Sequence, residues 1–256
     1  MFDQILAAAL DAAMLPVFAV AVVAGLVRGF AGFGAGLLFV PFASALIDPA
    51  SAVIMLWIAD GLPTLPLVAK AIPKCRFRQV LPVAAGYALG APAGVWLLKT
   101  ADPVPLRWFM AILVAAMLAL LISGRRYAGE PKPVYGVGVG AASGFLGGAT
   151  QLSGPPVLAY WLGGPDISWR IRANVLVFFA IATVLSGLSL WGGGVFTAER
   201  AVRGAAMIPF YAAGIFVGAR LFPLASDATF RRIAFALIAL AALLSLPLLD
   251  GLLGRG

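Results

Sequence analysis

Residues 25–42 read GLVRGFAGFGAGLLFVPF, an apolar run interrupted by five glycines and one arginine. Glycines at this density break or loosen a helix, because each one lowers the helix propensity of its segment. A second stretch of the same kind, residues 144–161, reads GFLGGATQLSGPPVLAYW. Gly25 and Gly144 open the two stretches at an offset of 119 residues. The chain therefore carries a broken apolar segment twice, and the predicted fold follows from this repetition.

The composition of the chain excludes a water-soluble domain. Hydrophobic residues make up 62% of the 256 positions and charged residues only 11%, whereas soluble domains have roughly 25% charged residues. Too few polar side chains remain to cover a soluble surface, and the mean hydropathy is +1.04. We therefore predict an all-α membrane protein with many spans, whose surroundings are a lipid bilayer.

Three counts narrow the class of function. The net charge of +8 is expected of a membrane protein with basic cytoplasmic loops, so we predict no nucleic-acid partner. The single cysteine, Cys75, excludes an internal disulfide and a cysteine metal cluster. The absence of histidine excludes a Ser/His intramembrane protease, and one mid-span aspartate cannot form an aspartyl dyad. We therefore predict no enzyme, no metal and no cofactor.

Apolar runs fill almost the whole chain, and most are about 18 to 23 residues long, enough to cross the hydrocarbon core of a bilayer. These longer runs are residues 5–27, 30–47, 51–69, 79–98, 105–123, 171–192, 203–221 and 230–249. The runs 134–147 and 149–163 are shorter, which predicts a re-entrant hairpin of two half-length helices. The N-terminal segment has no basic residue before Arg28, so we expect a mature helix there rather than a signal peptide.

The basic residues predict the orientation of the chain. The loops 70–78, 124–133, 164–172 and 220–232 lie on one side if the short hairpin returns to its own face. They hold 12 of the 18 basic residues: Lys70, Lys74, Arg76, Arg78, Arg125, Arg126, Lys132, Arg170, Arg172, Arg220, Arg231 and Arg232. The opposite loops hold Lys99, Arg107, Arg200, Arg203 and Arg255. By the positive-inside rule the first side is cytoplasmic, which predicts periplasmic termini in a bacterial inner membrane.

The similarity between the two halves extends beyond the glycine-rich stretches. At an offset of 124, a second series matches: Gly90, Gly94, Leu97, Arg107, Leu113, Ala115 and Leu120 correspond to Gly214, Gly218, Leu221, Arg231, Leu237, Ala239 and Leu244. We predict a first repeat at 1–123, a cytoplasmic linker at 124–133 and a second repeat at 134–256. Each repeat is a broken or re-entrant hairpin plus three transmembrane helices, an odd number of crossings that inverts the second repeat. The alternative is chance similarity among Ala/Leu/Gly helices.

The glycines have two predicted uses. Those spaced by four, such as Gly90 and Gly94, are typical of close helix packing. The denser clusters, 29–36 and 147–154, break helices, and a broken backbone at membrane depth offers N–H groups and a positive dipole end to an anion. We predict that the two clusters face each other as an anion cradle. Its candidate residues are Arg28, Gly32, Phe33, Gly34, Thr150, Gln151, Ser153 and Gly154. The alternative is that these residues only cap and bend helices.

Four polar residues within apolar runs are further candidates. Arg28 lies inside an apolar region, where an ion is costly, and guanidinium suits an oxyanion. The alternative for Arg28 is a position at the membrane interface, where its side chain reaches water. Asp60 is the only acid in the middle of a span. Its candidate roles are proton carrier, sodium ligand or counter-ion of Arg28, beside a purely structural contact. Arg172 and Asn174 begin a span and are candidates for an inner vestibule, with membrane anchoring as the alternative for Arg172.

These stretches resemble a known family. The glycine-rich hairpin ending in proline, GLVRGFAGFGAGLLFVP in the first half and GAASGFLGGATQLSGPPV in the second, followed by RANVLVFF, resembles the sulfite exporter TauE/SafE family of bacterial membrane proteins. The resemblance covers essentially the whole chain. It implies an inner-membrane transporter of sulfite, of sulfonates such as sulfoacetate, or of related organic anions. Thr150, Gln151 and Ser153 depart from the family's run of glycines, which favours a substrate with more hydrogen-bonding groups than sulfite.

The predicted function is secondary transport of a small sulfur-containing anion by alternating access. The alternatives are transport of another small anion or a cation, and a non-transporting membrane scaffold. The direction of transport, the coupling ion and the formation of a homodimer stay open, as does whether the first hairpin spans the membrane fully.

Overall fold

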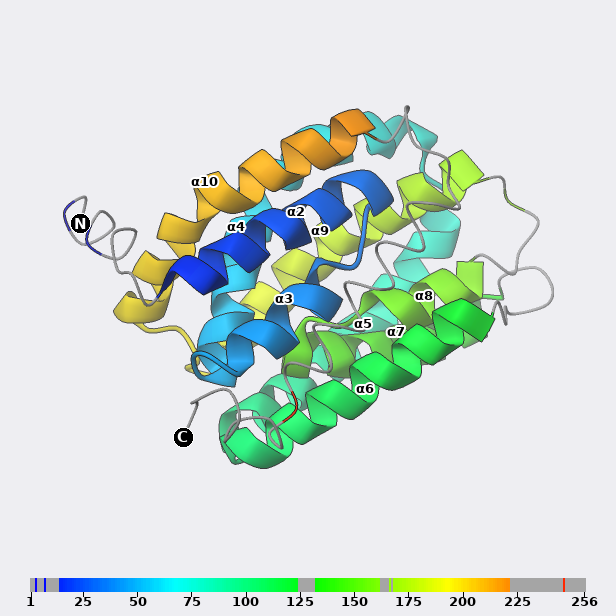
Figure 1. The fold of residues 1–256 in the computed structure, drawn as a ribbon. Helices are drawn as coiled ribbons and strands as arrows, with labels where there is room; N and C mark the ends of the chain where they lie inside the picture. The colour runs from blue at the N-terminus through cyan, green and yellow to red at the C-terminus, as the bar shows by residue number, and fades with distance from the viewer. Residues whose placement is uncertain are drawn as a thin grey trace. The chain divides into compact units, whose positions relative to one another are not determined.

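The computed structural model describes residues 14–123, 132–161, 166 and 168–221, together with the single residues Asp3, Ala7 and Leu246. Every element in these ranges is a helix, which confirms the predicted all-α class. In chain order they are α2 Leu15–Ala31, α3 Ala35–Ser44, α4 Pro49–Ala71, η2 Ile72–Lys74, α5 Phe77–Thr100, α6 Pro103–Ser123, α7 Pro133–Thr150, α8 Gly154–Trp161, α9 Ser168–Gly192 and α10 Ala198–Leu221 (Figure 1). The predicted run 230–249, apart from Leu246, and the first residues of the run 5–27, apart from Ala7, lie outside the described residues.

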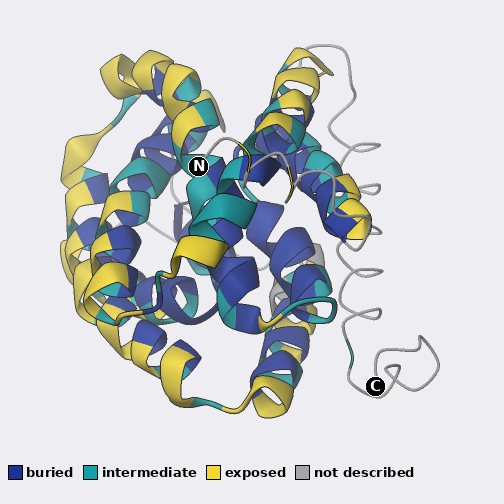
Figure 2. Cartoon of the chain, turned by 90° about the vertical axis from the view of Figure 1, so that its left-hand side faces the viewer, coloured by how far each residue is buried: buried dark blue, intermediate teal, exposed yellow. Residues whose placement is uncertain are grey.

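Four described helices are long and apolar enough to cross a membrane. They are Pro49–Lys74, Phe77–Thr100, Trp169–Gly192 and Ala198–Leu221, close to the predicted runs 51–69, 79–98, 171–192 and 203–221. Large apolar side chains on these helices are exposed, for example Leu89, Leu188 and Phe216. Figure 2 shows the same pattern as helices with one buried side and one exposed side. Such exposed apolar faces suit contact with hydrocarbon rather than with water.

Both predicted breaks occur, and the backbone angles explain where each helix stops. α2 ends at Ala31, just before Gly32, whose φ is 79°, and α3 begins after Gly34, whose φ is 96°. These left-handed angles are accessible to glycine at no steric cost. α7 ends at Thr150, just before Gln151, whose φ of 58° is unusual for a residue with a side chain. Each hairpin therefore turns over residues with positive φ.

Both breaks fall inside the predicted clusters, 29–36 and 147–154, but the first glycines of the clusters are not part of the turns. Gly29 and Gly148 stay helical, and each lies against the backbone of a neighbouring helix, where a Cβ would overlap the carbonyl oxygen of Ile215 or of Ala91. These glycines serve packing, and the turns use the residues that follow.

The second hairpin returns towards its own starting end, as predicted, but its arms are unequal. α7 has 18 residues and α8 only 8, rather than two half-length helices. The Ser143 hydroxyl, in the middle of α7, donates to the carbonyl oxygen of Ser153 at 2.6 Å. The Tyr160 hydroxyl near the end of α8 donates to the carbonyl oxygen of Lys132, just before α7, at 2.7 Å. α8 therefore runs back along the first part of α7.

The chain forms two compact units, and neither coincides with a sequential half. Unit 1 comprises Met1–Pro63, Ala101–Leu118 and Phe196–Gly256, and unit 2 comprises Thr64–Thr100 and Ala119–Val195. Unit 1 contains α2, α3 and α10, whereas unit 2 contains α5, α7, α8 and α9. Each unit therefore combines the hairpin of one predicted repeat with a helix of the other.

In unit 1, α2 and α10 lie side by side and approach closely through glycines (Figure 1). A Cβ on Gly25 would overlap the carbonyl oxygen of Tyr211. In the other direction, a Cβ on Gly214 would overlap the carbonyl oxygen of Val22. The predicted use of these glycines for close packing is therefore confirmed.

In unit 2, α7 and α5 make the corresponding contacts. A Cβ on Gly144 would overlap the carbonyl oxygen of Tyr87, and one on Gly90 would overlap that of Ala141. A residue of α2 corresponds to the residue of α7 that lies 119 positions later, and a residue of α10 corresponds to the residue of α5 that lies 124 positions earlier. Tyr211 therefore corresponds to Tyr87, and each of these α2/α10 contacts corresponds to one of the α7/α5 contacts. The same pair of offsets that relates the sequences thus relates the packing.

Candidate functional site

Arg28 is placed at the end of a helix by the glycine turn that follows it. It lies in the last turn of α2, and the N–H of Gly32 donates to its carbonyl oxygen at 2.8 Å. A cation is favourable at this end of a helix because it faces the negative end of the helix dipole. The turn thus ends α2 with the guanidinium close to the broken backbone.

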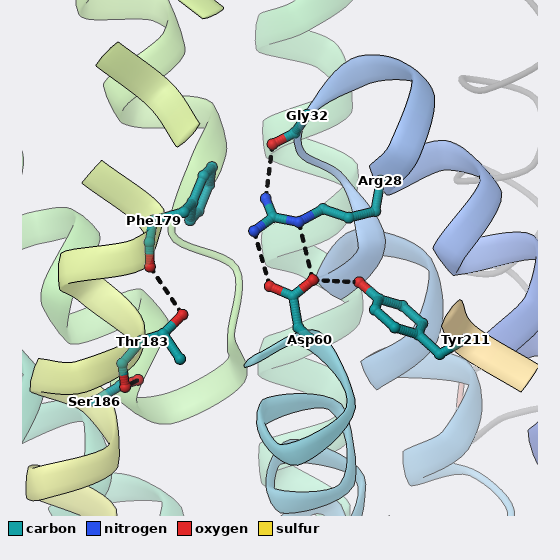
Figure 3. A network of polar contacts seen from close by, with 7 residues as sticks. All are labelled: Arg28, Gly32, Asp60, Phe179, Thr183, Ser186 and Tyr211. Atoms are coloured by element: carbon teal, nitrogen blue, oxygen red, sulfur yellow. Dashed lines mark hydrogen bonds and ion pairs between the residues drawn. The ribbon is translucent and has the colours of Figure 1, made fainter. Parts of the chain in front are cut away.

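Arg28 forms a two-point ion pair with Asp60, which lies midway along α4 (Figure 3). Its Nε donates to Asp60 Oδ1 at 2.9 Å, and its Nη2 donates to Asp60 Oδ2 at 2.8 Å. Its Nη1 donates to the carbonyl oxygen of Gly32 at 2.7 Å. The side chains of Arg28 and Asp60 are only 6% and 17% exposed. Of the candidate roles of Asp60, the structure shows that of counter-ion; proton carrier and sodium ligand stay predictions.

Tyr211, on α10, completes this cluster and was not among the predicted site residues. Its hydroxyl donates to Asp60 Oδ1 at 2.6 Å, and its side chain is fully buried (Figure 3). A repeated pattern in the sequence was the available signal: Tyr87 and Tyr211 each stand three residues before a matched glycine, Gly90 or Gly214. Asp60 thus receives hydrogen bonds from two different helices.

The Arg28–Asp60–Tyr211 cluster has the chemistry of an occupied anion site. Asp60 presents two oxygens to two parallel donors of Arg28, the arrangement in which guanidinium binds carboxylates and other oxyanions. The two charges cancel, as a buried pair of ions requires. An external oxyanion with similar oxygen spacing fits the same two donors once Asp60 has moved away.

The second glycine cluster, in unit 2, uses its polar groups within its own hairpin. The Thr150 hydroxyl donates to the carbonyl oxygen of Leu146 at 2.7 Å, and Gln151 Nε2 donates to that of Gly147 at 3.1 Å. The single hydrogen of Thr150 is therefore used inside α7, and in this conformation the hydroxyl acts towards a ligand only as an acceptor. Ser153 is buried beside the start of α8. The predicted meeting of the two clusters stays a prediction.

The two vestibule candidates differ in their surroundings. Asn174 is fully buried, and its Oδ1 accepts the N–H of Arg76 at 2.8 Å while its Nδ2 donates to Gln79 Oε1 at 2.8 Å. Its amide joins α9 to the start of α5 and is not open to solvent in this conformation. Arg172 lies one half-turn earlier on α9 and is partly exposed. A vestibule role stays a prediction for Arg172.

Asp166 ties together two loops that were predicted to lie on the same side of the membrane. It forms ion pairs with Arg76 at 2.9 Å and with Arg170 at 3.1 Å, and it accepts a hydrogen bond from Gln79 Nε2 at 2.8 Å. Burial alone opposes ionisation, but the hydrogen bonds from Gln79 and Arg170 and the two positive charges lower the pKa of Asp166. The loops 70–78 and 164–172 therefore meet at one end of unit 2.

Unit 1 has a similar but smaller group of polar contacts around Asp48. Arg200 Nη2 pairs with Asp48 Oδ1 at 3.1 Å, and Arg200 Nε donates to Ser51 Oγ at 3.1 Å. Partial burial raises the pKa of Asp48, but hydrogen bonds from Ser51 and the charge of Arg200 outweigh it, so the pKa is lowered overall. Arg200 corresponds to Arg76 at the offset of 124.

Arg107, predicted in a loop, lies instead within α6 and is buried.

Among the described residues, no three His, Cys, Asp or Glu side chains gather as a metal site requires.

Comparison with known proteins agrees with the resemblance read from the sequence. The family model described as sulfite exporter TauE/SafE matches residues 17–245. A Cupriavidus necator protein named "Probable sulfite/organosulfonate exporter TauE" is 30% identical over 230 residues, which cover 84% of this chain and 87% of that protein. No solved structure matches.

Proposed function

Since the chain belongs to the sulfite exporter TauE/SafE family, we propose that it is a secondary transporter that moves a small sulfur-containing anion across the bacterial inner membrane. The substrate class is a sulfonate such as sulfoacetate, or sulfite. The name of the C. necator relative supports this class, because it specifies sulfite and organosulfonates. We further propose that the protein has no enzymatic activity and that both termini are periplasmic.

The buried ion pair between Arg28 and Asp60 carries the proposal. An ion inside a membrane protein is retained at a cost of about 2.5–3.5 kcal/mol even on the lenient insertion scale. The two donors of Arg28 that hold Asp60, at 2.9 and 2.8 Å, match a sulfonate or sulfite as well as they match a carboxylate. The substrate thus takes the place of Asp60 on Arg28.

The broken hairpins supply further groups to the anion. The N–H groups at the start of α3, after Gly32, Phe33 and Gly34, lie next in the chain to the turn that holds Arg28. A helix start favours negative charge through its dipole and its free N–H groups. The corresponding groups of the second hairpin are those at Ser153 and Gly154, with Thr150 and Gln151 as further candidates. The first turn is thus a source of neutral donors beside one cationic side chain.

Alternating access is the proposed mechanism, with the two repeats inserted in opposite orientations. The correspondence between the α2/α10 and α7/α5 contacts supports it, because two units of like construction can exchange conformations. Within this scheme Asp60 is the candidate for coupling and Arg172 for an inner vestibule. We leave open a homodimer, which the scheme does not require.

A binding panel on the purified full-length protein tests the proposal. Calorimetry against sulfite, sulfoacetate, taurine and acetate should show binding of the sulfur oxyanions, and Arg28→Ala should abolish it. Arg203→Ala is the matched control, because Arg203 pairs with Glu199 within α10 at 2.8 Å rather than with Asp60. Unchanged binding in Arg28→Ala refutes the role of Arg28. Binding of acetate alone would favour the alternative of another small anion.

A further inference from the structure

Resting on the proposed function, we propose that substrate binding to Arg28 requires the Asp60 carboxylate to take up a proton, with Tyr211 as the residue that positions Asp60. One proton then accompanies each singly charged anion.

The first argument is the charge balance of the cluster. Arg28 and Asp60 together are neutral, and both side chains are largely buried. A monoanion added to this pair leaves one uncompensated negative charge in a region of low dielectric, which is costly. A proton on Asp60 restores neutrality, because the anion then becomes the counter-ion of Arg28. The cluster therefore accepts one negative charge for each proton.

The second argument is the use of the carboxylate oxygens. Oδ1 accepts from both Arg28 Nε and the Tyr211 hydroxyl, whereas Oδ2 accepts from Arg28 Nη2. When the anion takes the two donors of Arg28, both bonds from Arg28 to Asp60 break. The proton then binds Oδ2, and Oδ1 keeps the hydrogen bond from Tyr211. Tyr211 thus stays hydrogen-bonded to the carboxyl group as it leaves Arg28 and changes its charge.

The neighbouring helices of unit 1 identify Asp60 as the group that takes the proton. α2 presents Arg28 and α10 presents Tyr211, while α3 carries no titratable residue. α6 contributes Arg107, one turn before Met110, which contacts Ser44 at the far end of α3. Arg28 and Arg107 stay charged at any physiological pH, so the carboxylate is the acceptor. Sodium would have to approach oxygens already held by a guanidinium.

The equivalent place in unit 2 is neutral, which provides an internal control. Tyr87 corresponds to Tyr211, but the position of Arg28 is taken by Gly147, whose Cβ would overlap the Tyr87 hydroxyl. The Tyr87 hydroxyl has the neutral residues Ser186 and Ser153 as its polar neighbours, where Tyr211 has an aspartate. Tyr87→Phe therefore removes a buried tyrosine hydroxyl of the same repeat position without touching an ion pair.

Proton counting by calorimetry tests the proposal on the wild-type protein. Isethionate is the probe, because it stays a monoanion between pH 6 and 8, and titrations in two buffers of different ionisation enthalpy give the protons taken up. We expect one proton per isethionate and an affinity that rises about tenfold for each unit fall in pH. Asp48 and Asp166, whose pKa values are lowered, stay ionised in this range and do not contribute.

Three variants separate positioning from folding. Asp60→Asn should bind isethionate with no proton uptake and no pH dependence. Tyr211→Phe should still take up one proton per isethionate. Its curve of affinity against pH should lie about one to two pH units higher, because the ionised carboxylate loses a hydrogen bond. Tyr87→Phe should leave the pH profile unchanged.

The outcomes distinguish this inference from the proposed function. Binding that depends on Arg28 but takes up no proton, or that requires sodium, overturns the proton coupling and leaves the transporter proposal intact. Equal shifts in Tyr211→Phe and Tyr87→Phe overturn the positioning role of Tyr211. Absence of binding by isethionate, sulfoacetate and sulfite alike contradicts the proposed function itself, and the inference falls with it.

Discussion

At the scale of single residues, the cluster depends on mutual neutralisation of buried charges. Arg28 alone would be an uncompensated cation within an apolar helix pair, and Asp60 alone an uncompensated anion. Removal of one partner of a buried ion pair is much more damaging than replacement of both, because only the single change leaves an unpaired charge. The two residues are therefore expected to behave as one unit in stability as well as in binding.

A stability measurement on this pair follows directly. Asp60→Ala should lower the free energy of unfolding by about 3–5 kcal/mol, whereas Arg28→Met combined with Asp60→Leu should recover much of the loss. Thermal or denaturant unfolding in detergent micelles measures both. Asp48→Ala is the matched control, since the side chain of Asp48 is 46% exposed in its pair with Arg200. Equal losses for Asp60→Ala and Asp48→Ala would contradict the importance of burial.

At the scale of elements, pairs of helices are joined by backbone contact at glycines. In lipid no hydrophobic force brings helices together, so close approach through small residues supplies the packing. α7 offers a comparison within a single helix. Gly148 faces the backbone of α5, whereas a methyl group on Gly138 would have nothing within 4 Å.

These two glycines predict opposite effects of the same substitution. Gly148→Ala should destabilise the protein by about 1–3 kcal/mol, because its methyl group would overlap the carbonyl oxygen of Ala91. Gly138→Ala should be neutral or should stabilise the helix by up to about 1 kcal/mol. The unfolding midpoints of the two variants and the wild type, measured in one detergent, test both predictions. A destabilisation of similar size in both variants would contradict the proposed role of backbone contact at Gly148, because Gly138 has no such contact.

The ion pairs of Asp166 in unit 2 and of Asp48 in unit 1 are predicted to contribute different amounts to the stability of the protein. Asp166→Asn should cost about 1.5–3 kcal/mol, because Asp166 accepts charge-assisted bonds while its side chain is only 6% exposed. Asp48→Asn should cost at most about 1 kcal/mol, because its pair with Arg200 is more exposed.

The pH dependence of the Asp166 tie follows from the direction of its shift. The pKa of Asp166 is lowered from 3.8 in the folded protein, so its contribution is complete above that value and is lost as the pH falls through the folded pKa. The difference between wild type and Asp166→Asn should therefore be constant from pH 5 to pH 8. Unfolding of both proteins measured across that range checks this. A decline of the difference near neutral pH would contradict it.

At the scale of the whole molecule, orientation in the membrane is the property that inversion of the repeats predicts most sharply. Cys75, the one native cysteine, lies in the loop 70–78, but burial raises its pKa to about 11, so its thiol reacts slowly. Exposed neighbours make better reporters. Lys74 is exposed before α5, and Ala198 is exposed at the start of α10.

Cysteine labelling in intact cells checks this orientation. In a Cys75→Ser background, Lys74→Cys should react with an impermeant maleimide only after the membrane is opened, and Ala198→Cys should react at once. The two variants carry the same thiol at comparable exposure, so each controls for the other. Labelling of both from the outside would refute the predicted topology.

Much of this architecture is predictable from the chain because apolar length and glycine density are local properties. α4, α5, α9 and α10 begin and end within a few residues of their predicted runs. Arg28 and Asp60 were both identified as unusual ions, but their pairing joins residues 32 positions apart and depends on packing. Tyr211 was missed because its signal, the repeated spacing of Tyr87 and Tyr211 before matched glycines, does not reveal a partner for the hydroxyl. Both turns lie inside the predicted glycine clusters, but composition does not distinguish a glycine used for packing, such as Gly29, from one used for its φ, such as Gly32.

The combination of α2 with α10, and of α7 with α5, has a consequence for synthesis of the protein. Ribosomes deliver the chain in order, so α2 enters the membrane almost 170 residues before the start of its glycine-matched neighbour α10. Until nearly the whole chain has been made, the glycine-lined side of α2 cannot contact α10 and is covered by lipid or by an insertion factor. Unit 2 is completed first, and a nascent chain stopped after α9 would hold Arg28 without Tyr211 beside its counter-ion. Assembly of the Arg28–Asp60–Tyr211 cluster is therefore expected among the last events in biogenesis.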